Sequence, residues 1–311
     1  MSQASADLPA DLPADLPEAA VRRFSEGAFT SGLTVPDFAA CLQLGLEPVG
    51  FVQGFCVMQW QFYRAGTGMG MGLGGYGPMY GGTTGGYSEN WQCPHGMVSA
   101  DHRSWGQNYE QTWVESAWTE GFNSSYSRML EEATEAGAHG IVGVVDTSYP
   151  LADMGVLEFK VQGTAVKVAG GAPPADGRPW TTYLAGQRLA KLVEAGYAPV
   201  SIAAAVASVR VWANCVTANL TEGSNSMYSV AQPGSEIDQT VKAHAVVRRL
   251  ARVRVRDQLE HDSLHGAEMV TTEREMGEGD AELQCILRGN RVRRFREFDP
   301  LPPPVPTVRL L

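Results

Sequence analysis

The sequence predicts an α+β protein built from two copies of one unit, each an antiparallel sheet packed on a long helix. Two internal matches indicate the duplication. Residues 29–52 match residues 180–203 at a constant offset of 151, and His139 falls on His265 at an offset of 126. Because the two offsets differ by 25, the first copy is expected to carry about 25 extra residues between its matching ends.

A reversal of the apolar alternation near the end of each copy is a third observation. Apolar residues occupy one parity before Gly163 and the other parity after it, and the same reversal occurs at Gly289. A β-bulge produces such a reversal, and glycine is the residue that tolerates it. We therefore expect a bulge at both glycines.

The elements of each copy are predicted in the same order. A short strand at 29–32 or 180–183 opens the copy, and a helical segment follows that ends at Gly45 or Gly196, where glycine suits a left-handed cap. A mostly apolar strand, then a long helix, then two closing strands complete the copy. Apolar residues recur at helical spacing in each long helix: Trp113, Ala117, Phe122, Tyr126, Met129, Ala133 and Ala136 in the first, and Val247, Ala251, Val255 and Leu259 in the second.

These elements divide the chain into five parts. We expect a disordered Ala/Asp/Leu/Pro-repeat tail, a first unit with a Gly/Met-rich insertion at about 64–105, a linker, a second unit and a Pro-rich tail, at residues 1–24, 25–170, 171–179, 180–298 and 299–311. Both tails are candidate ligands for a protein partner.

Composition limits the classes of function. The formal charge is −10, and residues 1–179 hold 8 basic and 19 acidic side chains, so nucleic-acid binding is disfavoured. The start of the chain has no signal-peptide pattern, and no stretch has the length and apolarity of a membrane span. Five scattered cysteines without a C-x-x-C pair argue against a disulfide framework. We expect a cytoplasmic protein without membrane contact.

The first copy resembles a known family. The run "RMLEEATEAGAHGIVGVVDTSY" (128–149), followed by "LEFKVQGTAVKV" (157–168), resembles the YbjQ-like family, described as a heavy-metal-binding domain. The second copy has Asn290 and Arg291 where the first has Thr164 and Ala165, so it resembles a diverged member.

The resemblance implies a dodecin-like α+β fold, assembly into rings of five subunits and no particular reaction. For a chain with two such units, it predicts a homo-oligomer of five chains in two tiers, a ring of first units stacked on a ring of second units.

The insertion contains a candidate soft-metal site. Cys93, His95 and Met97 stand at alternate positions, so on an extended segment they would point to one side. Thiolate, imidazole and thioether are the ligands that suit Cu or Zn, and three further methionines are candidate ligands: Met69, Met71 and Met79. The alternative is a Gly/Met-rich contact loop without metal.

Two other groups have more than one interpretation. His139 and His265 are expected at the same turn from long helix to strand, either capping the helix C-terminus or binding metal. Basic side chains of the second long helix and of the end of the second unit could form a solvated face, bind an anion or nucleic acid, or pair with acids of the first unit such as Glu131, Glu132 and Glu135. These basic residues are Lys242, Arg248, Arg249, Arg252, Arg254, Arg256, Arg291, Arg293, Arg294 and Arg296.

The sequence contains no recognisable catalytic motif. We therefore expect a non-enzymatic, oligomeric binding or assembly protein, with a soft or heavy metal as its candidate ligand. The alternative is a structural scaffold that recruits protein partners through its loop and its tails, without metal.

Overall fold

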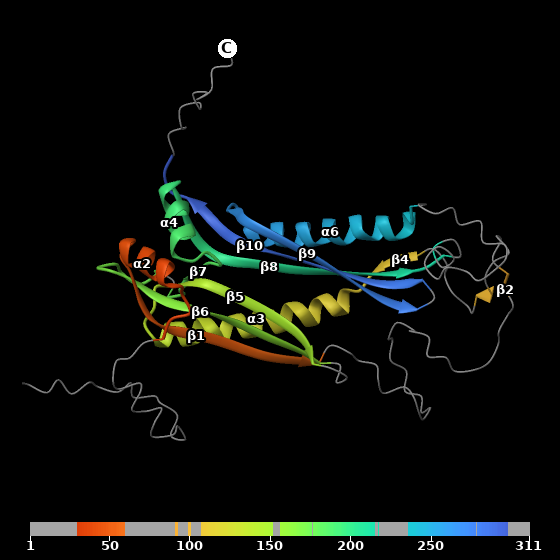
Figure 1. The fold of residues 1–311 in the computed structure, drawn as a ribbon, viewed down its shortest axis with the longest axis horizontal. Coiled ribbons are helices and arrows are strands. Elements are labelled where there is room, and N and C mark those ends of the chain that lie inside the picture. Colours follow the sequence, from red (N-terminus) through yellow and green to blue (C-terminus); the bar gives the residue numbers. More distant parts are fainter. Residues whose placement is uncertain are drawn as a thin grey trace, which may run out of the picture.

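The computed structural model describes residues 30–59, 91–92, 99–100, 107–151, 156–175, 177–214, 217, 236–277 and 279–297. The fold is α+β, as predicted, with two sheets and long helices packed against them (Figure 1). None of the described helices has the length and apolar composition needed to cross a membrane.

Residues 30–168, here called the N-terminal half, contain helices α2 and α3 and strands β1 to β6. In chain order they are α2 (Val35–Gln43), β1 (Leu46–Gln59), β2 (Trp91–Gln92), β3 (Ser99–Ala100), β4 (Gln107–Glu110), α3 (Thr112–Glu135), β5 (Gly140–Leu151) and β6 (Val156–Val168). The Thr34 side chain accepts a hydrogen bond from the Asp37 N–H and so caps α2, which ends before the positive-φ residue Gly45.

Residues 180–294, here called the C-terminal half, follow the same sequence of main elements. They are β7 (Trp180–Thr181), α4 (Gly186–Glu194), β8 (Tyr197–Trp212), α6 (Asp238–Leu259), β9 (Ser263–Gly277) and β10 (Asp280–Arg294). Helix α4 ends before Gly196, which also has a positive φ, so glycine caps close both short helices where the sequence predicted them.

The strands form two four-stranded sheets. Their orders are β1-β6-β5-β7 and β4-β8-β10-β9, and β2 and β3 form a separate pair. Pairing is antiparallel except between β5 and β7, which are parallel. In the first sheet Gly54 pairs with Val161, and in the second Ala205 pairs with Leu287, at offsets of 151 and 126.

The histidine match made from the sequence is wrong by three residues. Val142 pairs with Thr164 in the first sheet, and His265 pairs with Asn290 in the second, so β9 follows β5 at an offset of 123. Helix α6 is two residues shorter than α3, and its connection to the next strand is one residue shorter, which accounts for the difference. His139 precedes β5, whereas His265 lies within β9.

Both predicted bulges are present, with the extra residue in the neighbouring strand. Gly143 and Val144 of β5 together oppose Gly163, and Gly266 and Ala267 of β9 together oppose Gly289. Gly143 and Gly266 have φ values of +61° and +63°, a left-handed conformation that glycine adopts without strain.

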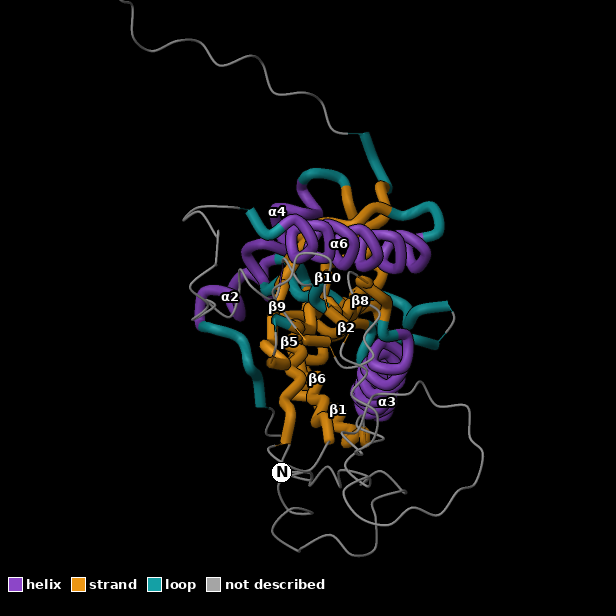
Figure 2. Tube along the Cα trace, turned by 90° about the vertical axis from the view of Figure 1, so that its right-hand side faces the viewer, coloured by secondary structure: helices purple, strands orange, loops and turns teal. Residues whose placement is uncertain are grey.

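The core consists of separate clusters around the two long helices, α3 and α6. Helix α6 covers one face of the second sheet through Ala243, Val247, Ala251 and Val255. The opposite face of that sheet packs on α3 and the first sheet, where Val206 joins the cluster of Trp118, Phe122 and Phe159. Figure 2 shows the strands gathered in the middle, with α6 over the second sheet and α3 along the side of the first.

Each half also adds a strand to the sheet of the other half. Strand β4 pairs with the edge of β8, and β7 pairs with the edge of β5. The strand predicted to open the first copy is not present in the described part of its range, where residues 30–34 lie outside any strand. The corresponding segment of the C-terminal half is a strand because it has the edge of β5 as its partner.

Candidate functional site

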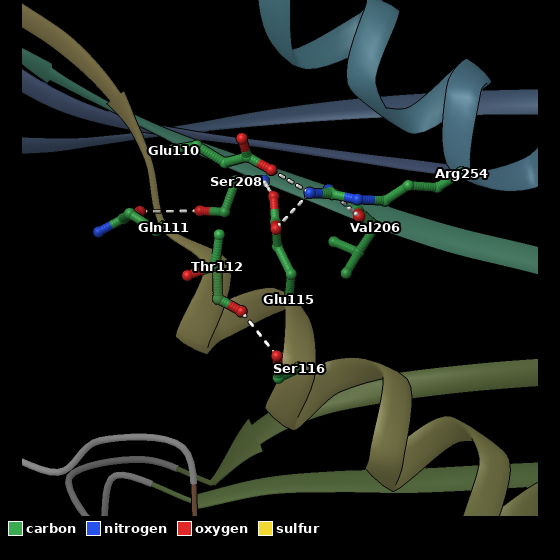
Figure 3. A network of polar contacts seen from close by, with 8 residues as sticks. All are labelled: Glu110, Gln111, Thr112, Glu115, Ser116, Val206, Ser208 and Arg254. Atoms are coloured by element: carbon green, nitrogen blue, oxygen red, sulfur yellow. Dashed lines mark hydrogen bonds and ion pairs between the residues drawn. The ribbon is translucent and has the colours of Figure 1, made fainter.

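The contact between the halves contains a buried polar network. It lies where α3 begins, between β8 and α6, and connects Glu110, Gln111 and Glu115 with Ser208 and Arg254 (Figure 3). Helix α3 and strand β4 belong to the N-terminal half, whereas β8 and α6 belong to the C-terminal half. The network therefore joins the two halves.

Glu115 occupies the centre of this network. Its Oε1 accepts a hydrogen bond from the Ser208 backbone N–H at 2.7 Å, and its Oε2 accepts one from Arg254. The side chain is only 7% exposed. Burial raises the pKa of the Glu115 carboxyl, and the hydrogen bonds from Arg254 and Ser208 oppose this shift only in part.

Arg254 holds both halves at once. Its Nη1 donates to the carbonyl oxygen of Val206 on β8 at 2.8 Å, and its Nη2 bonds the carboxylates of Glu110 and Glu115. The planar guanidinium suits such multiple bonding. Because both oxygens of Glu115 and both terminal nitrogens of Arg254 are engaged, the arrangement is suited to holding surfaces together.

The correspondence between the halves includes polar side chains of the two long helices. Arg128 on α3 bonds the carbonyl oxygen of Phe55 on β1, as Arg254 bonds that of Val206. Glu132 accepts from the Gln53 backbone N–H, and Gln258 donates to the carbonyl oxygen of Ala204. Each long helix thus places two polar side chains along the edge of its own first long strand.

A second polar contact joins the sheets. Arg288 on β10 bonds the Asp146 carboxylate on β5 at 3.2 Å and Glu268 on β9 at 2.9 Å. Next to it, burial raises the pKa of the Tyr183 hydroxyl well above its usual value, and the Asp146 charge adds to the effect. The Arg288–Asp146 ion pair thus joins the two sheets next to their bulges.

Of the three interpretations of the second-unit arginines, pairing with first-unit acids is confirmed for Arg254, although the acids that it meets differ from those expected. The pairs are Arg254 with Glu110 and Glu115, and Arg288 with Asp146. The predicted acid Glu132 instead serves β1 in its own half. Arg254 is one of the arginines that the sequence offered for such pairs, whereas Arg288 lies outside that set.

An open groove of about 910 Å³ runs along α3 beside the network. Its lining is polar and includes Glu120, Asn123, Arg128, Glu131 and Arg254. Neither histidine nor cysteine is among the described residues that line it. The groove offers hydrogen bonds and charges rather than the apolar enclosure typical of a small-molecule site.

The predicted metal ligands lie outside the described residues. This holds for Cys93, His95, Met97, Met69, Met71 and Met79. Over the part of the chain that is described, no three His, Cys, Asp or Glu side chains come close enough together to hold a metal ion.

The two histidines have different surroundings. Nδ1 of His139 accepts a hydrogen bond from the Val168 backbone N–H at 3.1 Å, which binds it to the end of β6 rather than to the C-terminus of α3. The carbonyl oxygen of His265 accepts from Asn290 at 3.1 Å. The expectation of one shared capping role was therefore wrong.

Comparison with known proteins identifies a distant relative. The protein described as Encapsulin nanocompartment protein Rv1762c, from Mycobacterium tuberculosis, is 26% identical over 248 residues, which cover 78% of this chain and 76% of the relative. No family model matches the chain, and no solved structure matches it.

These comparisons overturn the assignment to the YbjQ-like family. The relative that spans most of the chain has a different description, and no model of a heavy-metal-binding domain matches. The runs at 128–149 and 157–168 therefore did not identify the family.

Proposed function

We propose that this chain is a non-enzymatic, homo-oligomeric component of a protein nanocompartment. The relative of that description supports the proposal, because the similarity extends over 78% of the chain and spans both halves. The observation that carries it is the contact between the halves, in which a helix face and a strand of one half bind the sheet of the other. A surface of this kind is suited to assembly.

We further propose that the halves are two copies of one α+β unit. The equal order of the three long strands in each sheet, their equal registers at offsets of 151 and 126, and the bulges opposite Gly163 and Gly289 support the duplication. The boundaries expected from the sequence, 25–170 and 180–298 with a linker between them, are part of this proposal. An arrangement of five chains in two tiers stays a prediction of the sequence.

Purification of the full chain tests the proposed function. We expect light scattering to give a mass several times 33.5 kDa at micromolar concentration, and negative-stain microscopy to reveal closed particles of uniform diameter. A monomeric mass would contradict self-assembly. The nanocompartment role would be contradicted by oligomers that form no closed particles on their own and that also fail to join closed particles of the mycobacterial relative.

A Cu or Zn site at Cys93, His95 and Met97, with Met69, Met71 and Met79 as further ligands, remains a separate proposal. It rests on ligand chemistry alone. Titration of the full chain with Cu(I) or Zn should reach about one ion per chain, and the double change Cys93→Ala and His95→Ala should abolish binding. Absence of saturable binding would favour the alternative, in which the loop and the tails recruit protein partners.

A further inference from the structure

The two halves differ in which of their corresponding surfaces are covered. In the C-terminal half, Val206 and Ser208 lie on the face of β8 that packs on α3, and both are buried. The corresponding positions in β1, 151 residues earlier, are Phe55 and Val57, which are 42% and 48% exposed. Exposed aromatic and β-branched side chains on one sheet face indicate a contact surface.

The face of α6 that corresponds to the docked face of α3 is exposed to solvent at Val241. Within the chain, Glu115 of α3 bonds the Ser208 backbone. The position 126 residues later on α6 is Val241, which is 45% exposed. The internal contact joins Glu115 to Ser208. The exposed surfaces of α6 and β1 carry Val241 and Val57 at the corresponding positions, which is an apolar pair in place of a polar one.

The strand edges show the same difference. Within the chain, the Gly143 N–H donates to the Leu184 carbonyl oxygen at 3.0 Å, and the Thr182 N–H donates to the Ile141 carbonyl oxygen at 3.0 Å. The corresponding edge of β9 includes Gly266, which is exposed and has the same left-handed conformation as Gly143.

The segment that would pair with this edge is also exposed. Residues 30–32 correspond to residues 181–183, of which Thr181 and Thr182 are fully buried in the contact between the halves. Thr30, Ser31 and Gly32 are exposed and form no strand. Among the described strands β9 has a neighbour, β10, on one side only, and residues 30–32 lie in no strand, so the two are suited to pairing between chains.

A charge pair completes the correspondence. Arg254 bonds Glu110, two residues before α3 begins. At the offset of 126, Arg254 corresponds to Arg128, and Glu110 corresponds to Glu236, two residues before α6 begins. Arg128 and Glu236 have opposite charges, so a contact built like the internal one would place them within reach of each other.

We propose that neighbouring chains bind head to tail, with the exposed face of β1, β6 and β5 and residues 30–33 of one chain docked on α6 and β9 of the next. The occupant of this face is a second copy of the chain, because the internal contact already joins the same two kinds of surface. Such heterologous contacts repeat until they close into a ring or extend into a filament. The proposal deepens the proposed function, since it names the contact through which the chain would self-associate.

Cysteine cross-linking of the full chain tests the contact. In a background of Cys93→Ser and Cys215→Ser, chains with Val57→Cys are mixed with chains with Val241→Cys and oxidised. We expect a disulfide-linked dimer from the mixture, and none from either variant alone. The matched control is Val246→Cys, which is 44% exposed on α6 at a position that corresponds to Glu120 in the groove. A mixture that gives no dimer, or gives as much with Val246→Cys, would overturn the proposal.

Charge reversal provides a second test that does not depend on oxidation. Arg128→Glu and Glu236→Arg should each lower the oligomer mass in light scattering by at least half, and the double variant should restore it. Circular dichroism checks that each variant is folded. Failure of the double variant to restore the mass would overturn the proposed pair.

The outcomes separate this inference from the proposed function. Closed particles without the Val57–Val241 cross-link would sink the head-to-tail contact and leave the nanocompartment role standing. Cross-linked chains that form no closed particles would support the head-to-tail contact and contradict the nanocompartment role.

Discussion

Glu115 and Arg254 lie on helices of different halves, and their side chains meet beside strand β8 (Figure 3). The carboxylate is almost fully buried, and its other oxygen is held by the Ser208 N–H. A buried carboxylate is stable only when its partners are in place, because an unpaired charge is poorly solvated there. The pair therefore makes the packing of each half depend on the presence of the other.

Removal of the cation should weaken this packing. We expect Arg254→Ala to lower the free energy of unfolding by about 1–3 kcal/mol, because the buried Glu115 carboxyl loses its main hydrogen-bonding partner. The matched control is Arg249→Ala, an exposed arginine of the same helix, which should change stability by less than about 0.5 kcal/mol. Urea denaturation of both variants checks this. Equal midpoints would mean that the pair contributes nothing to stability.

The raised pKa of Glu115 predicts a pH dependence of definite sign. Burial favours the protonated carboxyl in the folded chain, so the contribution of this group is fully present below its unfolded pKa and is lost as pH rises through its folded pKa. The stability of the natural chain relative to Glu115→Gln should therefore increase as pH falls through this window. Urea unfolding of both proteins from pH 4 to 8 measures the difference, and a decrease on acidification would contradict the assignment.

Gly54 marks the closest approach of α3 to β1. A Cβ atom there would lie 1.7 Å from the Ser125 carbonyl oxygen and 2.6 Å from the Met129 nitrogen. We expect Gly54→Ala to destabilise the protein by about 1–3 kcal/mol or more, because the helix would have to move away. Gly50→Ala, on the same strand with nothing within 4 Å of a new Cβ, is the control. Thermal unfolding that does not distinguish the two would argue against this close packing.

Asn290 is a buried hydrogen-bonding centre within the C-terminal half. Its Oδ1 accepts from the Tyr183 N–H at 2.7 Å and from the Thr182 hydroxyl at 2.8 Å, and the residue is 1% exposed. Thr164 stands at the corresponding position and accepts from the Gly32 N–H. We expect Asn290→Thr to retain an acceptor, and Asn290→Leu to cost about 2 kcal/mol more because it leaves the Tyr183 N–H unpaired. Chemical denaturation of the two variants provides the measurement, and equal stability would count against the role of the acceptor.

The local elements were accessible from the sequence because they depend on near neighbours. Glycine caps at Gly45 and Gly196 follow from a backbone conformation that other residues resist, and the bulges at Gly163 and Gly289 follow from the parity of apolar side chains. The three-residue error at His139 and His265 arose because a change in helix length alters the alignment without altering either pattern.

The sequence by itself determined the α+β class, the order of the long elements and the arginine-bearing helix, since each depends on spacing along the chain. Only the tertiary structure decided that Glu115 meets Arg254, that β4 and β7 pair with the sheet of the opposite half, and that the face with Phe55 and Val57 is exposed while that with Val206 and Ser208 is covered. Alternation along a strand assigns side chains to a face, but the neighbour that covers the face comes from far away in the chain or from another molecule.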